Sequence, residues 1–141
     1  MASQNQNICV RRERDTCQIC WATTAEGDFE VSDDTTGAAG MGKLGSGCCS
    51  YKNDGMLTGS GWDCVKIPAA TKKGGTTLGV VGAYGFCGGE LATIADSVIS
   101  ASVCSKSTPF NIRFLSDLYE TITEMGKTPN GFRLAYTLRN C

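Results

Sequence analysis

Nine cysteines are spread along the whole of this 141-residue chain, and they restrict its fold more than any other feature of the sequence. They are Cys9, Cys17, Cys20, Cys48, Cys49, Cys64, Cys87, Cys104 and Cys141. Cysteines dispersed in this way are typical of a disulfide framework formed in an oxidising compartment. The alternative is zinc, bound through Cys17-Gln18-Ile19-Cys20 and Cys48-Cys49, although structural zinc sites usually take their ligands from pairs of CxxC motifs. The odd number leaves one thiol that is free or bonded to another chain.

The charged and apolar residues exclude several classes of function. The chain has no histidine, which removes His-based catalytic triads and His-ligated metal sites. Lys and Arg total 13 and Asp and Glu total 14, so there is no cationic excess to bind nucleic acid or a membrane surface. No apolar run reaches the roughly 18 residues of a membrane-spanning helix. Residues 1–7 lack the apolar core of a signal peptide, so we expect a segment or a processed form of a longer secreted protein.

Alternating apolar and polar residues predict an all-β chain. Residues 110–115 and 132–139 alternate in the manner of half-buried antiparallel strands. Residues 8–22 are predicted to form a β-hairpin whose turn is the charged run 11–15. Further strands are predicted at residues 28–32, 62–67, 78–86 and 91–104, the last of which also fits a short helix. The 18 glycines and the short strands favour an antiparallel β-sandwich stapled by disulfides.

The predicted sandwich is a single domain over residues 1–141 with one long insertion. Residues 33–61 are rich in glycine and other small residues and carry few apolar side chains. A loop of this length inside a domain usually has a function or is tied down. We expect Cys48 and Cys49 to attach this loop to the rest of the domain.

Several short motifs together resemble the CUB family. Phe114-Leu115-Ser116-Asp117, followed by Gly131-Phe132-Arg133-Leu134-Ala135-Tyr136, is similar to the end of a CUB domain. Phe86-Cys87-Gly88 and Trp62-Asp63-Cys64-Val65-Lys66-Ile67 resemble two upstream CUB elements. Residues 7–13 look like the start of secreted CUB-like proteins of arthropods. The resemblance covers roughly residues 8–138. It implies a jelly-roll β-sandwich, secretion to the extracellular space, and a place as the C-terminal module of a longer chain.

The resemblance also implies a function and a set of site residues. CUB domains are extracellular, non-catalytic modules that bind proteins, and we extend this expectation to glycans. Their disulfide pattern implies a bond between Cys64 and Cys87, with Cys9 bonded elsewhere or free and the remaining pairings open. Many CUB domains bind calcium through one Glu and two Asp residues and grip a lysine of the partner at that site. Carried over to this chain, the calcium ligands are Glu30, Asp63 and Asp117, and Ca²⁺ accepts such oxygen ligands.

Two other functions are alternatives to a binding module. The glycine-rich region and an unpaired cysteine suit a structural or self-associating protein of an extracellular matrix, cuticle or adhesive. An enzyme would need an acid–base pair such as Asp63 with Asp117, or a Cys–Lys nucleophile pair, and no motif with the required spacing supports either. We therefore predict a module without catalytic activity that binds an extracellular protein. The unpaired cysteine could link it to a second copy or to a neighbouring domain, and we predict neither nucleic-acid binding nor membrane insertion.

Overall fold

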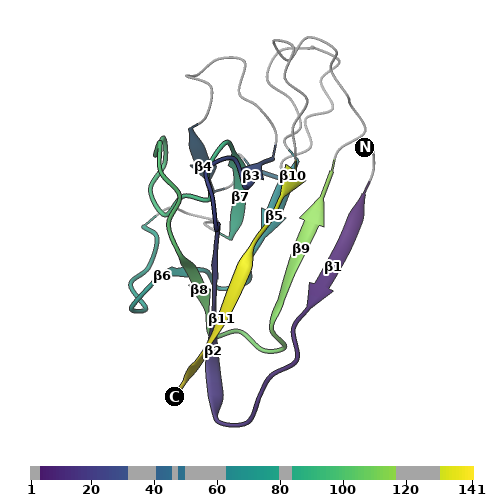
Figure 1. Ribbon diagram of the computed structural model, residues 1–141, viewed down its shortest axis with the longest axis vertical. Coiled ribbons are helices and arrows are strands. Elements are labelled where there is room, and N and C mark those ends of the chain that lie inside the picture. The colour runs from purple at the N-terminus through teal and green to yellow at the C-terminus, as the bar shows by residue number, and fades with distance from the viewer. Residues whose placement is uncertain (1–3, 32–40, 46–47, 50–62, 80–83, 117–130) are drawn as a thin grey trace.

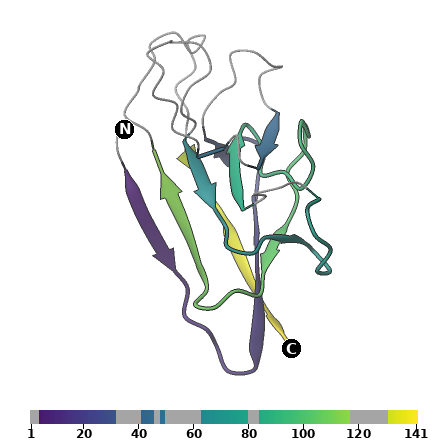
Figure 2. The same cartoon turned by 180° about the vertical axis from the view of Figure 1, so that it is seen from behind.

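Two antiparallel sheets pack face to face in the computed structural model, which describes residues 4–31, 41–45, 48–49, 63–79, 84–116 and 131–141 (Figures 1 and 2). The five-stranded sheet has the order β1 (Asn5–Cys9), β9 (Asn111–Leu115), β5 (Cys64–Lys66), β7 (Gly85–Gly88) and β4 (Gly42–Leu44). The four-stranded sheet has the order β11 (Ala135–Asn140), β2 (Thr16–Ala22), β8 (Val103–Ser105) and β6 (Thr71–Lys72). A separate two-stranded ribbon joins β3 (Phe29–Glu30) to β10 (Gly131–Phe132). The described part contains no helix, and the predicted antiparallel β-sandwich is confirmed.

The core lies between the two sheets and follows from the alternation along each strand. In β9, Ile112 is 1% exposed and points inward, whereas the next residue, Arg113, is exposed. Successive side chains of a strand point to opposite faces, so one face of each sheet is apolar. The buried cluster consists of Ile19, Trp21, Phe29, Val31, Leu44, Val65, Ile67, Leu78, Phe86, Leu91, Val103, Phe110 and Ile112. Every sheet contributes to this cluster, so burial of its apolar surface holds the sheets together.

The predicted hairpin at residues 8–22 is wrong. Both of its strands exist, but β1 pairs with β9 in one sheet, and β2 pairs with β8 and β11 in the other. The charged run 11–15 is therefore a connection between the two sheets and not a hairpin turn. Alternation identifies a strand from its own residues, but the choice of partner depends on contacts with distant parts of the chain.

Three other strand predictions are corrected in their extent. Residues 132–139 do not form one strand, because Arg133 and Leu134 separate β10 from β11. Residues 80–83 lie outside the described residues, and of the described positions within 78–86, Gly85 and Phe86 belong to a strand. The segment 91–104 is irregular until β8 begins at Val103. Residues 33–61 include strand β4, so this region is not solely a loop; most of its other residues lie outside the described part.

Three disulfides confirm the framework, but one predicted pairing is wrong. The bonds join Cys20 to Cys104, Cys48 to Cys87 and Cys49 to Cys64. The implied bond between Cys64 and Cys87 is therefore not formed. The β5–β7 register does place these two cysteines in neighbouring strands at one level, but the adjacent cysteines of residues 48–49 each take one of them as partner. Six of the nine cysteines are in disulfides, which also overturns the zinc alternative.

Candidate functional site

One end of the sandwich carries two of the three carboxylates predicted to bind calcium. Asp63 directly precedes β5, whose first residue pairs with the last residue of β9. Glu30 ends β3, and the next residue, Val31, exchanges two backbone hydrogen bonds of 3.0 and 2.7 Å with Gly88 at the end of β7. Figure 1 places β3, the start of β5 and the end of β9 at the same end of the molecule. The topology therefore brings Glu30 and Asp63 to one end.

The third predicted calcium ligand, Asp117, lies outside the described residues. The chain before it is held by Ser116, whose hydroxyl accepts a hydrogen bond of 2.7 Å from the Gln4 amide and whose own amide donates to the Gln4 carbonyl at 2.9 Å. Among the described residues, no group of three or more His, Cys, Asp or Glu side chains is placed to hold a metal ion. The calcium site therefore stays a prediction.

A further carboxylate near this end, Asp28, is committed to the turn between β2 and β3. It accepts hydrogen bonds from the Thr24 amide at 2.9 Å, the Thr24 hydroxyl at 2.5 Å and the Ala25 amide at 2.8 Å. The hydrogen bonds from Thr24 lower the pKa of Asp28 below the ordinary value of 3.8. These donors already satisfy the charged form of Asp28. Its carboxylate therefore stabilises the turn that leads into β3, and we do not include it among the candidate calcium ligands.

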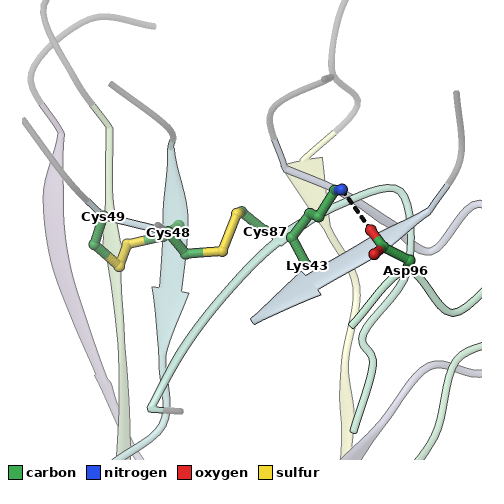
Figure 3. The surroundings of a disulfide bond; sticks show 6 residues. Lys43, Cys48, Cys49, Cys87 and Asp96 are labelled. Carbon is green, nitrogen blue, oxygen red and sulfur yellow. Dashed lines mark hydrogen bonds and ion pairs between the residues drawn. A yellow bond between two sulfur atoms is a disulfide. The ribbon is translucent and has the colours of Figure 1, made fainter. Parts of the chain in front are cut away.

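Two disulfides lie side by side on the outer face of the five-stranded sheet (Figure 3). Cys64 in β5 and Cys87 in β7 are 0% and 1% exposed although they point away from the main core. The segment 48–49 covers them, and Leu115 packs against the sulfur cluster. The expectation that Cys48 and Cys49 attach the long insertion to the domain is confirmed. The cluster forms a second, small core on the outer face of this sheet, and it includes Cys64, the residue that follows Asp63.

An ion pair fastens the loop after β7 to the edge strand β4. The Lys43 ammonium lies 2.5 Å from a carboxylate oxygen of Asp96 (Figure 3). Two backbone hydrogen bonds support it, from the Gly42 amide to the Ser97 carbonyl at 2.7 Å and from the Asp96 amide to the Gly42 carbonyl at 2.9 Å. The edge strand is thus covered along its outer side, which protects its backbone from pairing with another chain.

A hollow of about 640 Å³ lies on the same outer face, beyond the disulfide cluster. We call it the outer hollow. Its polar lining consists of Asn5, Asn7, Lys66, Tyr84, Asn111 and Arg113. None of these side chains is among the site residues predicted from the sequence. Alternation in residues 110–115 did mark Arg113 as facing outward, but nothing local indicated that Lys66 would lie opposite it.

Three cysteines carry no disulfide in the structure. Cys9 is exposed at the end of the edge strand β1. Cys17 and Cys141 lie next to each other where β2 meets the end of β11: the β2–β11 register shifts by one residue there, and the Cys141 amide donates to the Asp15 carbonyl at 3.3 Å. A hydrogen bond between the two thiols raises the pKa of Cys141. The odd number of cysteines predicts one free thiol, and the structure has three: Cys9, and the adjacent Cys17 and Cys141.

The sequence model of the animal CUB domain matches residues 1–139, essentially the whole chain. The chain belongs to the CUB family. Comparison of the chain with curated proteins and with solved structures found no match. CUB domains mediate protein–protein interactions outside the cell and are generally binding modules without catalytic activity. In the described part of this CUB domain, no helix is long and apolar enough to cross a membrane.

Proposed function

We propose that this CUB domain is a secreted, non-catalytic module that binds an extracellular partner through the end of the sandwich carrying Glu30 and Asp63, with calcium as part of that site. The observation that carries the proposal is the pairing of β5 with the end of β9. It sets Asp63 beside the strand end that Asp117 follows by two residues in the sequence. β3 contributes Glu30 to the same end.

The donor set suits a hard cation. Ca²⁺ takes six to eight oxygen ligands, and carboxylates from separate loops can supply several of them. Carboxylates gathered at one place without a cation repel one another, which favours binding of a positive ion there. The ion would supply charge neutralisation and order to the loops. Carboxylate oxygens left over would accept a basic side chain of the partner.

Thermal unfolding with and without Ca²⁺ tests the metal part of the proposal. Added Ca²⁺ is expected to raise the Tm of the disulfide-intact chain, since a ligand that binds only the folded state stabilises it. Asp63→Asn and Asp117→Asn are expected to abolish this shift. Asp96→Asn is the matched control, because Asp96 is an exposed carboxylate engaged with Lys43, and it should keep the full shift. A wild-type Tm that does not respond to Ca²⁺ removes calcium from the proposal.

A second function, self-association into an extracellular structure, has one observation in its favour. Cys9 is exposed at the end of β1, which is an edge strand of its sheet, so a second chain could bond there. Non-reducing electrophoresis and sedimentation separate the two functions. A binding module stays monomeric, or forms at most a defined dimer, as its concentration rises. Covalent polymers or growth of the assembly with concentration would favour the structural function instead.

A further inference from the structure

We propose that the outer hollow binds an acidic saccharide, one that carries a carboxylate or a sulfate group. The proposal rests on the binding-module function above but uses a different surface, away from Glu30 and Asp63. Three properties of the hollow carry it: a row of side chains fixed by strand register, two cations that form no ion pair among the described residues, and amide and aromatic groups suited to a sugar.

Strand register aligns the floor of the hollow. Arg113 in β9 is the direct partner of Asn7 in β1 on one side and of Lys66 in β5 on the other. Residues in such a row point to the same face of the sheet. The next position in the row is Gly85 in β7, the partner of Lys66, and the Cys48–Cys49 segment covers it, so the row of exposed side chains ends there. Tyr84 precedes Gly85 and adds an aromatic ring to the lining of the hollow.

Two positively charged side chains lie next to each other in this row, and their described contacts are with uncharged side chains. Lys66 and Arg113 are directly opposite each other, and like charges in this arrangement destabilise a sheet. The Arg113 Nε donates to the Asn5 side-chain oxygen at 2.7 Å, and the Lys66 ammonium lies 5.6 Å from the centre of the Tyr84 ring. Within the described part of the chain, no carboxylate lines the hollow and neither cation forms an ion pair. An anion bound between them would relieve the repulsion.

The other lining groups select the kind of anion. Asparagine amides carry donors and acceptors that match the hydroxyls of a sugar, and three of them line the hollow. Asn5 also accepts from Arg113 and Asn7 donates to the Cys9 Sγ, so Asn111 is the one of the three whose side chain forms no hydrogen bond among the described residues. The Tyr84 side chain is 49% exposed and offers an apolar face to the carbon side of a sugar ring. The guanidinium fork matches a carboxylate or a sulfate with two parallel hydrogen bonds. The hollow also falls within the roughly 300–1,000 Å³ of small-molecule sites.

An array of saccharides and one peptide tests the proposal on the disulfide-intact chain. The probes are neutral, sialylated, uronate-bearing and sulfated oligosaccharides, with desulfated forms of the last, and an oligoglutamate peptide. Acidic saccharides are expected to bind and neutral ones are not, and the desulfated arm shows which anionic group is recognised. Equal or stronger binding of oligoglutamate would mean that the hollow takes acidic peptides and that the saccharide proposal is wrong.

Variants assign any binding to the hollow. Calorimetric titration with the best probe is expected to show at least about a tenfold loss of affinity for Arg113→Gln and for Lys66→Gln, since each removes a charge-assisted contact. Lys106→Gln removes an exposed lysine outside the hollow and should leave affinity unchanged. Unchanged affinity in both hollow variants overturns the proposal. The same variants should keep the Ca²⁺-dependent Tm shift, and saccharide binding should persist in a chelator, so failure here is distinct from failure of the calcium-dependent site.

A separate observation concerns Cys17 and Cys141, which we infer are joined as a fourth disulfide in the secreted protein. The bulge in the β2–β11 pairing and the hydrogen bond of 3.3 Å from the Cys141 amide to the Asp15 carbonyl place the two cysteines next to each other, at the end of the sandwich opposite β3. The bond would form by exchange with the disulfide of an oxidoreductase. Both thiols lose a proton, and their two electrons reduce the donor disulfide to a dithiol. Cys9 would then be the one odd cysteine, on a different strand and exposed.

Tryptic cleavage after Arg139 makes this inference directly measurable. It separates the dipeptide Asn140-Cys141 from the rest of the chain. In the secreted protein, denatured and digested without reduction at acidic pH after thiol blocking, the dipeptide is expected to stay bonded to the fragment that contains Cys17. One blocked thiol per chain, on Cys9, is expected. Cys17→Ser should release the dipeptide and Cys9→Ser should not. Release from the wild-type chain, or three blocked thiols, would show that the inference is wrong.

Discussion

Gly85 lies directly beneath the disulfide sulfur of Cys49. A β-carbon on Gly85 would be 3.2 Å from the Cys49 Sγ, 3.3 Å from the Gly45 carbonyl oxygen and 3.4 Å from the Cys48 β-carbon. Both cysteines are bonded to the sheet, so none of these neighbours can move away easily. The close approach of the insertion to the sheet therefore requires glycine at this position of β7.

Gly85→Ala is expected to lower the free energy of unfolding by about 1–3 kcal/mol, the usual effect of overpacking a fixed contact. Guanidinium denaturation under non-reducing conditions measures it. Gly42→Ala should be more harmful, since a β-carbon there would lie 2.5 Å from the Ala92 β-carbon and 2.6 Å from the Glu90 carbonyl oxygen. A Gly85→Ala variant as stable as the wild type would contradict the packing argument.

The disulfide between Cys20 and Cys104 closes the longest loop of the three, with a sequence separation of 84. Replacing both cysteines by alanine is expected to lower the free energy of unfolding by about 2–5 kcal/mol. The separation of Cys49 and Cys64 is 15, so the loop-entropy model predicts that their double replacement is milder by about 1.5 kcal/mol. Parallel denaturation curves of the two double variants test the order, and the reverse order would rule out loop entropy as the dominant cause.

Asp28 should contribute to stability in a pH-dependent way. Its pKa is lower in the folded chain than its ordinary value of 3.8, mainly because the Thr24 hydroxyl and amide donate to the carboxylate. Such a group stabilises the fold above its unfolded pKa, and the contribution disappears as the pH falls below 3.8 through the folded value. Asp28→Asn cannot ionise, so its Tm should lie below that of the wild type at neutral pH and converge with it in acid.

Thr24→Val provides the control for the Asp28 prediction, because it removes the largest cause of the lowered pKa and leaves the carboxylate in place. Its Tm curve between pH 2 and pH 7 should fall between those of the wild type and Asp28→Asn. If the Tm difference between the wild type and Asp28→Asn were the same at every pH, the ionisation of the carboxylate would make no contribution to stability.

The ion pair between Lys43 and Asp96 is expected to contribute little. The two side chains are 30% and 59% exposed, and exposed pairs are worth about 0–1 kcal/mol. Asp96→Asn should therefore change the free energy of unfolding by less than about 1 kcal/mol, and by still less in high salt, which screens the charges. Backbone hydrogen bonds continue to hold this loop to β4. A loss above 2 kcal/mol would show that the pair is coupled to the fold more strongly than its exposure indicates.

Much of the fold could be predicted from the sequence because the apolar–polar alternation of a strand is visible in the strand's own residues. Residues 111–115 alternate clearly, and the structure has β9 there with Ile112 inside and Arg113 outside. The break between β10 and β11 could not be predicted, because Arg133 and Leu134 continue the alternation even though the chain leaves one pairing for another at that point. For the candidate site, the sequence predicted a strand at residues 62–67 that includes Asp63, whereas β5 begins one residue after it, and only the pairing of β5 with β9 shows which other loops share this end.

The class of this protein follows from features of the chain that can be read locally: its period-two alternation predicts strands, its dispersed cysteines predict a disulfide framework, and its lack of histidine excludes whole classes of catalytic site. The tertiary structure alone decided which strands pair, which cysteines bond, and that Lys66 lies opposite Arg113. This difference arises because an apolar–polar alternation is visible within roughly four to eight consecutive residues. Partners such as Cys20 and Cys104 are chosen by packing between segments 84 residues apart, which no local pattern encodes.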